Sequence, residues 1–338
     1  MARTKLSITA NNAAFAAYPG EILLDAAQQQ GISLPHECRV GQCGSCLVRL
    51  QQGQLLGGET NHPGIFHACQ ARVFSDVEIR YDRTPKVTKC RGTLIGVDRL
   101  TPDIRGLTLS LCDRARYRPG QYYRVRFQGY PTRCYSPSPP FVGRDDRNTL
   151  RFHVKMVRDG QVSSKLDQRI QPGHKVTIEG PFGAAFFRPG EGTRLLLVAS
   201  GTGFAPIWSI AKASLLRQPN VPLLLIAGVR RLSSLYMLPA LCGLAAYPSA
   251  DFVVTVDDAQ SASGIVLRGT PDQHLPDICS SDLVYAAGSP SMVEKVSNAA
   301  ARSGATFYAD AFLPNGVPTP SWWSAKWRRL RSMLATCD

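Results

Sequence analysis

The chain has 338 residues, and its length and 44% hydrophobic content are those of a globular protein with two or three domains. Its longest apolar runs, at 195–200 and 221–229, are too short to span a membrane, and its N-terminus lacks the apolar core of a signal peptide. The net charge of +14 lies mostly in residues 81–190, where 21 basic residues accompany nine acidic ones. This favours an anionic cofactor, an acidic protein partner or a solvated surface, and no recognised motif supports nucleic acid.

The N-terminal segment has a mixed strand and helix pattern. Short alternating runs predict strands at 5–9, 46–50 and 77–81, and one helix is expected at 22–30. A charged, proline-containing stretch at 80–89 then predicts a linker.

Four cysteines follow the predicted helix, with C-x4-C-x2-C spacing and a distant fourth member: Cys38, Cys43, Cys46 and Cys69. This spacing is typical of a plant-type [2Fe–2S] cluster, in which one tight loop supplies three thiolates. Gly41 and Gly44 let backbone N–H groups turn toward the cluster sulfurs. The alternatives are free thiols or a zinc site, which usually has two close Cys or Cys/His pairs. The ten cysteines form no small disulfide framework, which predicts a reducing cytoplasm.

Residues 90–190 show short alternating runs broken by Pro and Gly, which predict an antiparallel barrel. Within them, the tetrapeptide 133–136 is Arg-Cys-Tyr-Ser. Arg133 suits a pyrophosphate, Tyr135 on the same strand face can cover a flavin, and Ser136 can hydrogen-bond a flavin nitrogen. Residues 159–164 place a glycine before hydroxyl side chains, so they predict a helix N-terminus that faces phosphate, or an ordinary turn.

From Arg194 onward, buried-type strands at 195–199, 223–228, 252–256 and 283–287 alternate with helices, which predicts an open α/β sheet. Two glycine turns follow strands, at 201–206 (Gly-Thr-Gly-Phe-Ala-Pro) and 288–290 (Gly-Ser-Pro). Such turns let the backbone approach a pyrophosphate or nicotinamide, although the G-x-G-x-x-G fingerprint is absent. Because Arg230, and no acidic residue, follows the 223–228 strand, we expect NADPH to be accepted as well as NADH.

Together with Tyr308-Ala-Asp-Ala-Phe312, these motifs resemble the ferredoxin–NADP reductase superfamily with an N-terminal plant-type ferredoxin domain. They are most similar to reductase components of aromatic-ring dioxygenases of the naphthalene and terephthalate types. The resemblance implies a multidomain α+β and α/β fold: a β-grasp [2Fe–2S] domain at 1–82, an FAD-binding β-barrel at 88–190, an NAD(P)-binding α/β domain at 191–313 and a basic, Trp-rich tail at 314–338.

The resemblance also implies site residues. Those for FAD are Arg133, Cys134, Tyr135, Ser136, His153, Val154, Lys155, Gly160, Val162 and Ser163. Those for NAD(P)H are Gly201, Thr202, Gly203, Phe204, Ala205, Pro206, Gly288, Ser289 and Pro290, to which the strand-end argument adds Arg230. Phe312 is similar to an aromatic that stacks on the flavin, Asp310 matches an acidic position near it, and these two with Ser136 are the expected catalytic residues. Ala287 departs from the family, which often has Cys there.

The resemblance implies an enzyme that passes electrons from NAD(P)H to FAD, to the cluster, and then to an oxygenase component or an intermediary ferredoxin. We expect it to be a monomer. One alternative is a ferredoxin-like shuttle with a degenerate nucleotide site, which Ala287 supports. Another is a reductase for a membrane-bound hydroxylase. In the tail, an apolar stripe of Trp323, Trp327, Leu330 and Leu334 predicts either partner docking or packing against the chain itself, whereas membrane association is not expected.

Overall fold

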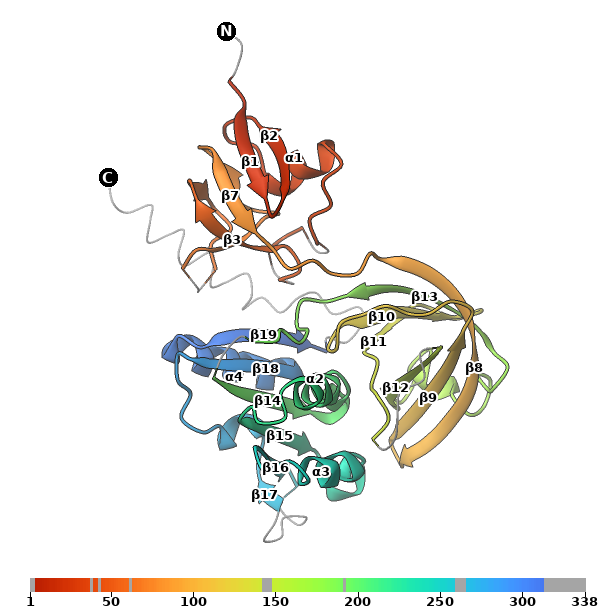
Figure 1. The fold of residues 1–338 in the computed structure, drawn as a ribbon. Coiled ribbons are helices and arrows are strands. Elements are labelled where there is room, and N and C mark those ends of the chain that lie inside the picture. The colour runs from red at the N-terminus through yellow and green to blue at the C-terminus, as the bar shows by residue number, and fades with distance from the viewer. Residues whose placement is uncertain are drawn as a thin grey trace.

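The computed structural model describes residues 4–36, 39–41, 44–60, 63–141, 148–190, 193–258 and 266–312. Cys38, Cys43 and the tail at 314–338 lie outside these ranges. Three sheet-based units follow one another along the chain, with the N-terminal unit at one end (Figure 1). Within the described ranges, no helix has the length and apolar character that crossing a membrane requires.

The N-terminal domain is a five-stranded mixed sheet covered by one helix. Its strand order is β2-β1-β7-β3-β5, with β1 parallel to β7 and the other pairs antiparallel. Helix α1 buries four apolar side chains against the sheet, whose alternate residues Ile8 and Ala10 are fully buried. The elements are β1 (Leu6–Ala10), β2 (Ala13–Ala17), α1 (Leu23–Gln29), β3 (Leu47–Gln52), β4 (Leu55–Leu56), β5 (Ile65–His67), β6 (Arg72–Val73) and β7 (Val77–Arg80).

The central domain is an antiparallel six-stranded barrel with strand order β11-β10-β13-β8-β9-β12. Register shifts in the long strand β8, near Gly96 and near Leu100, bend the sheet, as β-bulges do. The two edge strands β11 and β12 lie beside each other, and the N–H of Ser138 donates to the carbonyl of Arg151 at 2.9 Å. The elements are β8 (Thr88–Thr101), β9 (Ile104–Leu111), β10 (Tyr122–Phe127), β11 (Arg133–Tyr135), β12 (Thr149–Lys155), η1 (Ser163–Lys165) and β13 (Lys175–Phe182).

The C-terminal domain is a parallel six-stranded sheet with strand order β17-β16-β15-β14-β18-β19. Its strands are β14 (Arg194–Ser200), β15 (Leu223–Val229), β16 (Ala250–Val256), β17 (Val266–Arg268), β18 (Asp282–Gly288) and β19 (Thr306–Ala311). Its helices are η2 (Gly201–Gly203), α2 (Phe204–Arg217), η3 (Leu232–Ser234), α3 (Leu238–Leu244), η5 (Pro271–His274) and α4 (Pro290–Ser303).

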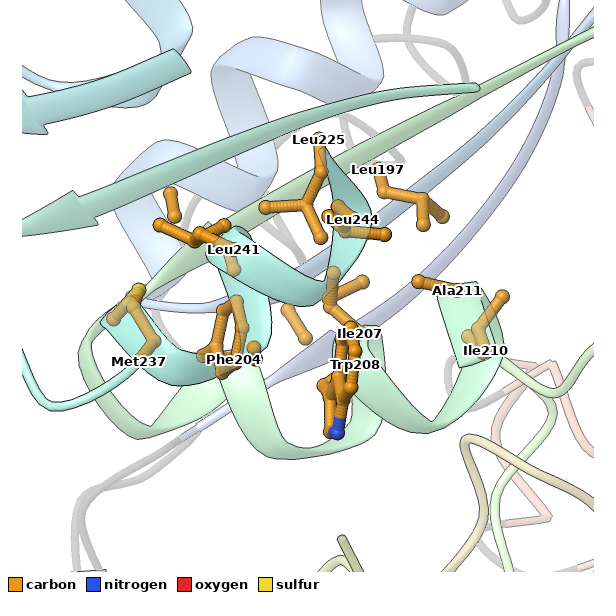
Figure 2. Packing of buried hydrophobic residues seen from close by; sticks show 14 of the residues in the cluster. Leu197, Phe204, Ile207, Trp208, Ile210, Ala211, Leu225, Met237, Leu241 and Leu244 are labelled. Atoms are coloured by element: carbon orange, nitrogen blue, oxygen red, sulfur yellow. The ribbon is translucent and has the colours of Figure 1, made fainter. Parts of the chain in front are cut away.

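Helices cover both faces of this sheet, which explains the continuous apolar runs in its strands. Leu195 and Leu197 of β14 pack with α2 and α3, whereas Leu196 and Val198 pack with α4. Figure 2 shows Leu197 and Leu225 above side chains from α2 and α3. The sequence therefore predicts this domain well, because both the alternation and the strand length are visible in it.

An aromatic cluster joins the barrel to the C-terminal domain. The His153 ring of β12 lies 5.4 Å from the Phe141 ring and 4.9 Å from the Tyr236 ring. Phe141 also contacts Phe204 and Trp208 of α2, and those two rings are stacked with centroids 6.2 Å apart. Burial lowers the pKa of His153 to about 3, so this imidazole is neutral near pH 7.

We predict that His153→Phe reduces the loss of stability at acidic pH. The folded-state pKa of His153 is depressed below the ordinary value of 6.5, so the unfolded chain takes up a proton that the folded chain excludes. Wild-type stability therefore falls as the pH drops from about 6.5 toward the folded pKa, and a phenyl ring removes this contribution. Calorimetric melting temperatures of both proteins, measured between neutral pH and about pH 4.5, should diverge from each other in acid. Parallel curves would show that His153 does not make this contribution.

Candidate functional site

The N-terminal domain brings two of the four predicted cluster ligands together. Cys46 precedes β3 and Cys69 follows β5, yet their Sγ atoms are 3.3 Å apart. Both side chains are buried, with 3% and 4% of their surface exposed. Two converging, buried thiols fit a cluster whose sulfur ligands come from one loop and one distant segment. Cys38 and Cys43 lie outside the described residues.

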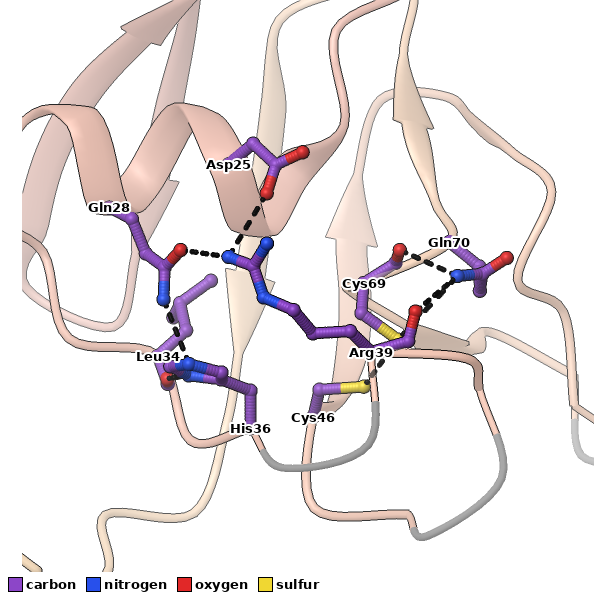
Figure 3. Close-up of polar contacts among 8 residues, drawn as sticks. All are labelled: Asp25, Gln28, Leu34, His36, Arg39, Cys46, Cys69 and Gln70. Carbon is purple, nitrogen blue, oxygen red and sulfur yellow. Dashed lines mark hydrogen bonds and ion pairs between the residues drawn. The ribbon is translucent and has the colours of Figure 1, made fainter.

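Polar contacts hold Arg39, which lies between α1 and the Cys69–Gln70 segment (Figure 3). The side-chain amide of Gln70 donates to the carbonyl of Arg39 at 2.8 Å and to the carbonyl of Cys69 at 2.9 Å. The Arg39 guanidinium in turn reaches Asp25 of α1 at 3.3 Å and donates to Gln28. Arg39 is therefore tied to α1 on one side and to Gln70, next to Cys69, on the other.

Two of these supporting residues, Gln70 and Arg39, are absent from the sequence-based set. In the sequence, only the position of Gln70 next to Cys69 could have indicated this supporting role. Gly41 has φ of +70°, and a Cβ there would lie 3.1 Å from Cγ of Gln70. The glycine thus permits the left-handed turn close to this side chain.

The barrel brings together two segments that the sequence associates with FAD. Arg133 and Tyr135 lie on β11, paired with Val125 and Tyr123 of β10. The Arg133 guanidinium donates to the side chain of Gln161 at 3.2 Å, which joins residues 133–136 to the 159–164 turn. Burial raises the pKa of Tyr135 far above its usual range, against a smaller opposite effect of Arg133, so its hydroxyl stays protonated.

Of the two alternatives at 159–164, the structure has the turn, and the short 3-10 helix η1 begins within it at Ser163. The Ser163 hydroxyl accepts a hydrogen bond from the N–H of Val157 at 3.1 Å, and the Ser164 hydroxyl donates to the carbonyl of Gly160 at 2.6 Å. These hydroxyls close their own loop. Short-range side-chain-to-backbone bonds of this kind compete with helix formation.

The other predicted flavin residues lie in different surroundings. Along β12, Val154 points into the barrel core, His153 lies in the aromatic cluster, and Lys155 is exposed at the strand end. Val162 is buried in the same barrel core. Ser136 is also buried, with 6% of its surface exposed, whereas Cys134 is exposed. The structure therefore connects Arg133 directly with the 159–164 turn, but not with the His153 side chain.

The two glycine turns of the C-terminal domain pack directly against each other. A Cβ on Gly203 would lie 2.2 Å from the carbonyl oxygen of Ala287, and a Cβ on Gly288 would lie 2.3 Å from Oγ of Ser200. The N–H of Ser289 donates to the same Ser200 hydroxyl at 2.8 Å. Only glycine fits at either position, and Ser200 is a bridging residue that the sequence analysis missed.

The end of β19 lies at the carboxyl edge of the parallel sheet, beside the two glycine turns. In the sheet register, Asp310 pairs with Ala287, and the N–H of Phe312 donates to the carbonyl of Gly288 at 2.8 Å. Barrel strand β12 also contacts the Gly201–Gly203 turn. The structure thus places Asp310 and Phe312 beside both glycine turns, at the junction with the barrel.

Arg230 lies at the same edge, exposed after β15. Its carbonyl accepts a hydrogen bond from the N–H of Asp258 at 3.2 Å. Partial burial raises the pKa of the adjacent Asp257, and the nearby Arg230 charge opposes that shift. Acidic residues therefore stand near Arg230. Their closeness to Arg230 is not visible in the sequence, because they follow β16 and Arg230 follows β15.

Comparisons with known proteins agree with this three-part organisation. Residues 8–74 match a 2Fe-2S iron-sulfur cluster binding domain, residues 91–187 an oxidoreductase FAD-binding domain, and residues 197–298 an oxidoreductase NAD-binding domain. The reductase component of the Ralstonia sp. naphthalene 1,2-dioxygenase/salicylate 5-hydroxylase systems is 31% identical over 321 residues, which cover 88% of this chain and 95% of that protein.

A second relative and a solved structure extend the likeness over nearly the whole chain. The ferredoxin–NAD(P)+ reductase component of the Pseudomonas putida naphthalene 1,2-dioxygenase system is 28% identical over 335 residues, which cover 93% of this chain and all of that protein. The ferredoxin reductase in carbazole 1,9a-dioxygenase shares the fold, with a TM-score of 0.62, 24% identity, and coverage of 92% of this chain and 99% of that one. The chain therefore belongs to the family of ferredoxin–NAD(P)+ reductase components, and it is an oxidoreductase with domains for a [2Fe–2S] cluster, FAD and NAD(P).

Proposed function

We propose that this chain is the reductase component of an aromatic-ring-hydroxylating oxygenase system. It takes electrons from NAD(P)H and delivers them to an oxygenase component or to an intermediary ferredoxin. The observation that carries the proposal is the meeting of the Gly203 and Gly288 turns, Phe312 and barrel strand β12 at one edge. The relatives named for naphthalene dioxygenase systems support the choice of partner.

The barrel residues are proposed to hold FAD. Arg133 supplies a charged, bidentate donor for the pyrophosphate, and Gln161 orients its guanidinium. Tyr135, Ser136 and the backbone of 153–155 complete the proposed surface for the flavin. When bound, FAD accepts a hydride from the nicotinamide, and the [2Fe–2S] cluster accepts single electrons from it.

The carboxyl edge of the parallel sheet is proposed to bind NAD(P)H. Gly201, with φ of +56°, and Gly203 turn the chain from β14 into α2, which brings backbone N–H groups toward a pyrophosphate. Gly288 and Ser289 border the nicotinamide position, with Phe312 and Asp310 beside it. The close fit of the two turns supports a working nucleotide site over the alternative of a degenerate one.

The four thiolates of Cys38, Cys43, Cys46 and Cys69 are the proposed ligands of the cluster. The 3.3 Å separation of the Cys46 and Cys69 sulfurs supports this assignment. We also propose a monomer that acts in the cytoplasm, where a reducing environment preserves such thiols.

The overall function is tested by electron delivery to artificial acceptors. Protein loaded with FAD and cluster should reduce ferricyanide and cytochrome c with NADH or NADPH. Addition of an oxygenase component and its aromatic substrate should then yield a hydroxylated product. Failure to reduce either acceptor with either coenzyme would overturn the proposal.

We predict that Cys46→Ser abolishes electron delivery to the oxygenase but leaves reduction of the flavin by NAD(P)H largely intact. Removing one thiolate disrupts the cluster, which lies after the flavin in the proposed order. Stopped-flow absorbance measures the flavin step, and coupled turnover measures delivery. Cys242→Ser is the matched control, because Cys242 is an exposed thiol on α3. Equal loss of flavin reduction, with FAD still bound, would contradict the proposed order.

We predict that Arg230→Ala raises the KM for NADPH by about ten-fold, the effect of losing one charge-assisted hydrogen bond to a 2′-phosphate. The KM for NADH should change little, because NADH lacks that phosphate. Arg231→Ala provides a control with the same change of charge at the next residue. An unchanged KM for NADPH would show that Arg230 does not contact the coenzyme.

A further inference from the structure

Arg188 lies where the three domains meet. Its side chain is 6% exposed, although it is an arginine. Its Nε donates to Asp82 at 2.7 Å, and its Nη1 donates to the carbonyls of Ala184 at 2.9 Å and Phe186 at 3.0 Å. Asp82 belongs to the segment that connects β7 to β8, so one guanidinium joins the end of the N-terminal domain to the end of the barrel.

The same guanidinium also reaches the nucleotide domain. Its central carbon lies 3.7 Å from the centroid of the Tyr308 ring of β19 and 3.8 Å from that of Phe186. Tyr285 of β18 stacks on Tyr308 at 5.4 Å, and its hydroxyl donates to the carbonyl of Phe186 at 2.9 Å. Arginine can make planar stacking contacts and forked hydrogen bonds at once, which lysine cannot do.

Arg188 remains charged in these surroundings. Burial alone would lower its pKa, but the net shift is upward because Tyr308, Tyr285 and Asp82 favour the protonated form. A buried guanidinium whose partners come from separate domains loses several contacts at once if those domains separate. Separation would break the Asp82 hydrogen bond and the Tyr308 stacking contact together, so these contacts favour the docked arrangement.

These contacts lead toward both proposed cofactor sites. Ala184, which Arg188 holds by its carbonyl, lies against the cluster loop, since a Cβ on Gly44 would be 3.5 Å from that of Ala184. Tyr308 is on the strand that continues to Asp310 and Phe312 at the nucleotide edge. Between the N-terminal and nucleotide domains a cavity of about 440 Å³, lined in part by Arg80, Arg188 and Tyr308, interrupts the packing. Specific contacts such as those of Arg188 therefore matter more to the docking.

We propose that Arg188 is a positioning residue that fixes the [2Fe–2S] domain against the flavin and nucleotide domains and thereby sets the rate of electron transfer from flavin to cluster. In that step one electron leaves the reduced flavin and enters the oxidised cluster, and Arg188 is not among the residues proposed to hold either group. The inference rests on the proposed function, because it requires electrons to move between these two sites.

The test compares Arg188→Ala with wild type in the holoprotein. Anaerobic stopped-flow after mixing with NADH should show flavin reduction at the wild-type rate and cluster reduction slowed several-fold, because electron transfer depends on the distance at which docking holds the two groups. Trypsin should also cut the linker faster after the exposed residues Arg83 and Lys86, because Asp82 is no longer held. This second readout does not depend on electron transfer.

Three further variants sharpen the test. Arg188→Lys can keep a charge near Asp82 but not the stacking, so it should restore the cluster rate only in part. Asp82→Asn leaves Arg188 in place and should slow cluster reduction and speed linker cleavage by smaller amounts. This variant keeps the proposal testable if Arg188→Ala fails to fold. Arg118→Ala is the matched control, since it removes another guanidinium from the Phe186 ring and leaves the Arg188 contacts intact.

The outcomes separate this inference from the proposed function. Wild-type cluster reduction and wild-type cleavage in both Arg188→Ala and Asp82→Asn would overturn the role of Arg188. Equal slowing of the flavin and cluster steps would also overturn it, because the residue would then act on the flavin site. A wild-type protein whose cluster is never reduced by NADH would instead refute the proposed function.

Discussion

The arrangement of the nucleotide edge depends on direct backbone contact between two turns. Gly203 and Gly288 approach Ala287 and Ser200 so closely that any side chain would collide with backbone atoms or with the Ser200 hydroxyl. This contact fixes β14 and β18 at their carboxyl ends, where ligands of open α/β sheets bind. It also sets the end of β19, because Phe312 bonds to the carbonyl of Gly288. A coenzyme can therefore approach backbone rather than side chains.

The barrel is attached to the nucleotide domain through aromatic packing, beside which Ser234 hydrogen-bonds to Asp103 and Lys212 to the carbonyl of Pro140. His153, Phe141 and Tyr236 contribute rings from both domains, and burial keeps the imidazole neutral. Apolar packing of this kind holds a fixed geometry with little dependence on salt. By contrast, the N-terminal domain is connected through polar and cationic contacts around Asp82 and Arg188. The two junctions thus differ in physical character, and they serve two different steps in the proposed electron route.

Much of the fold was predictable because it follows local pattern. The C-terminal strands are buried on both faces and appear as apolar runs. The cysteine spacing and the glycine turns mark positions where other residues could not ligate a cluster or allow close backbone approach. The sequence left a helix N-terminus and an ordinary turn open at 159–164, and the Ser163 and Ser164 hydroxyls bond to nearby backbone and close a turn. Such competition is invisible in the residue types alone, since a turn and a helix cap use the same amino acids.

The residues missed in the candidate site act through tertiary contacts. Gln70, Ser200 and Arg188 belong to no motif, and each matters because the fold brings a distant segment to it. Asp257 escaped notice for the same reason, as it follows β16 while Arg230 follows β15. Sequence pattern identifies which elements form and which turns need glycine, whereas the supporting contacts emerge only when those elements pack together.

The most direct test of the account is an anaerobic titration of the loaded protein with NADH or NADPH, followed by visible absorbance and by electron paramagnetic resonance of the frozen samples. The account predicts that flavin absorbance is bleached and that a reduced [2Fe–2S] signal then appears with no other protein present. Bleaching of the flavin without any cluster signal, when the cluster is present at full occupancy, would contradict an electron route that runs through both groups.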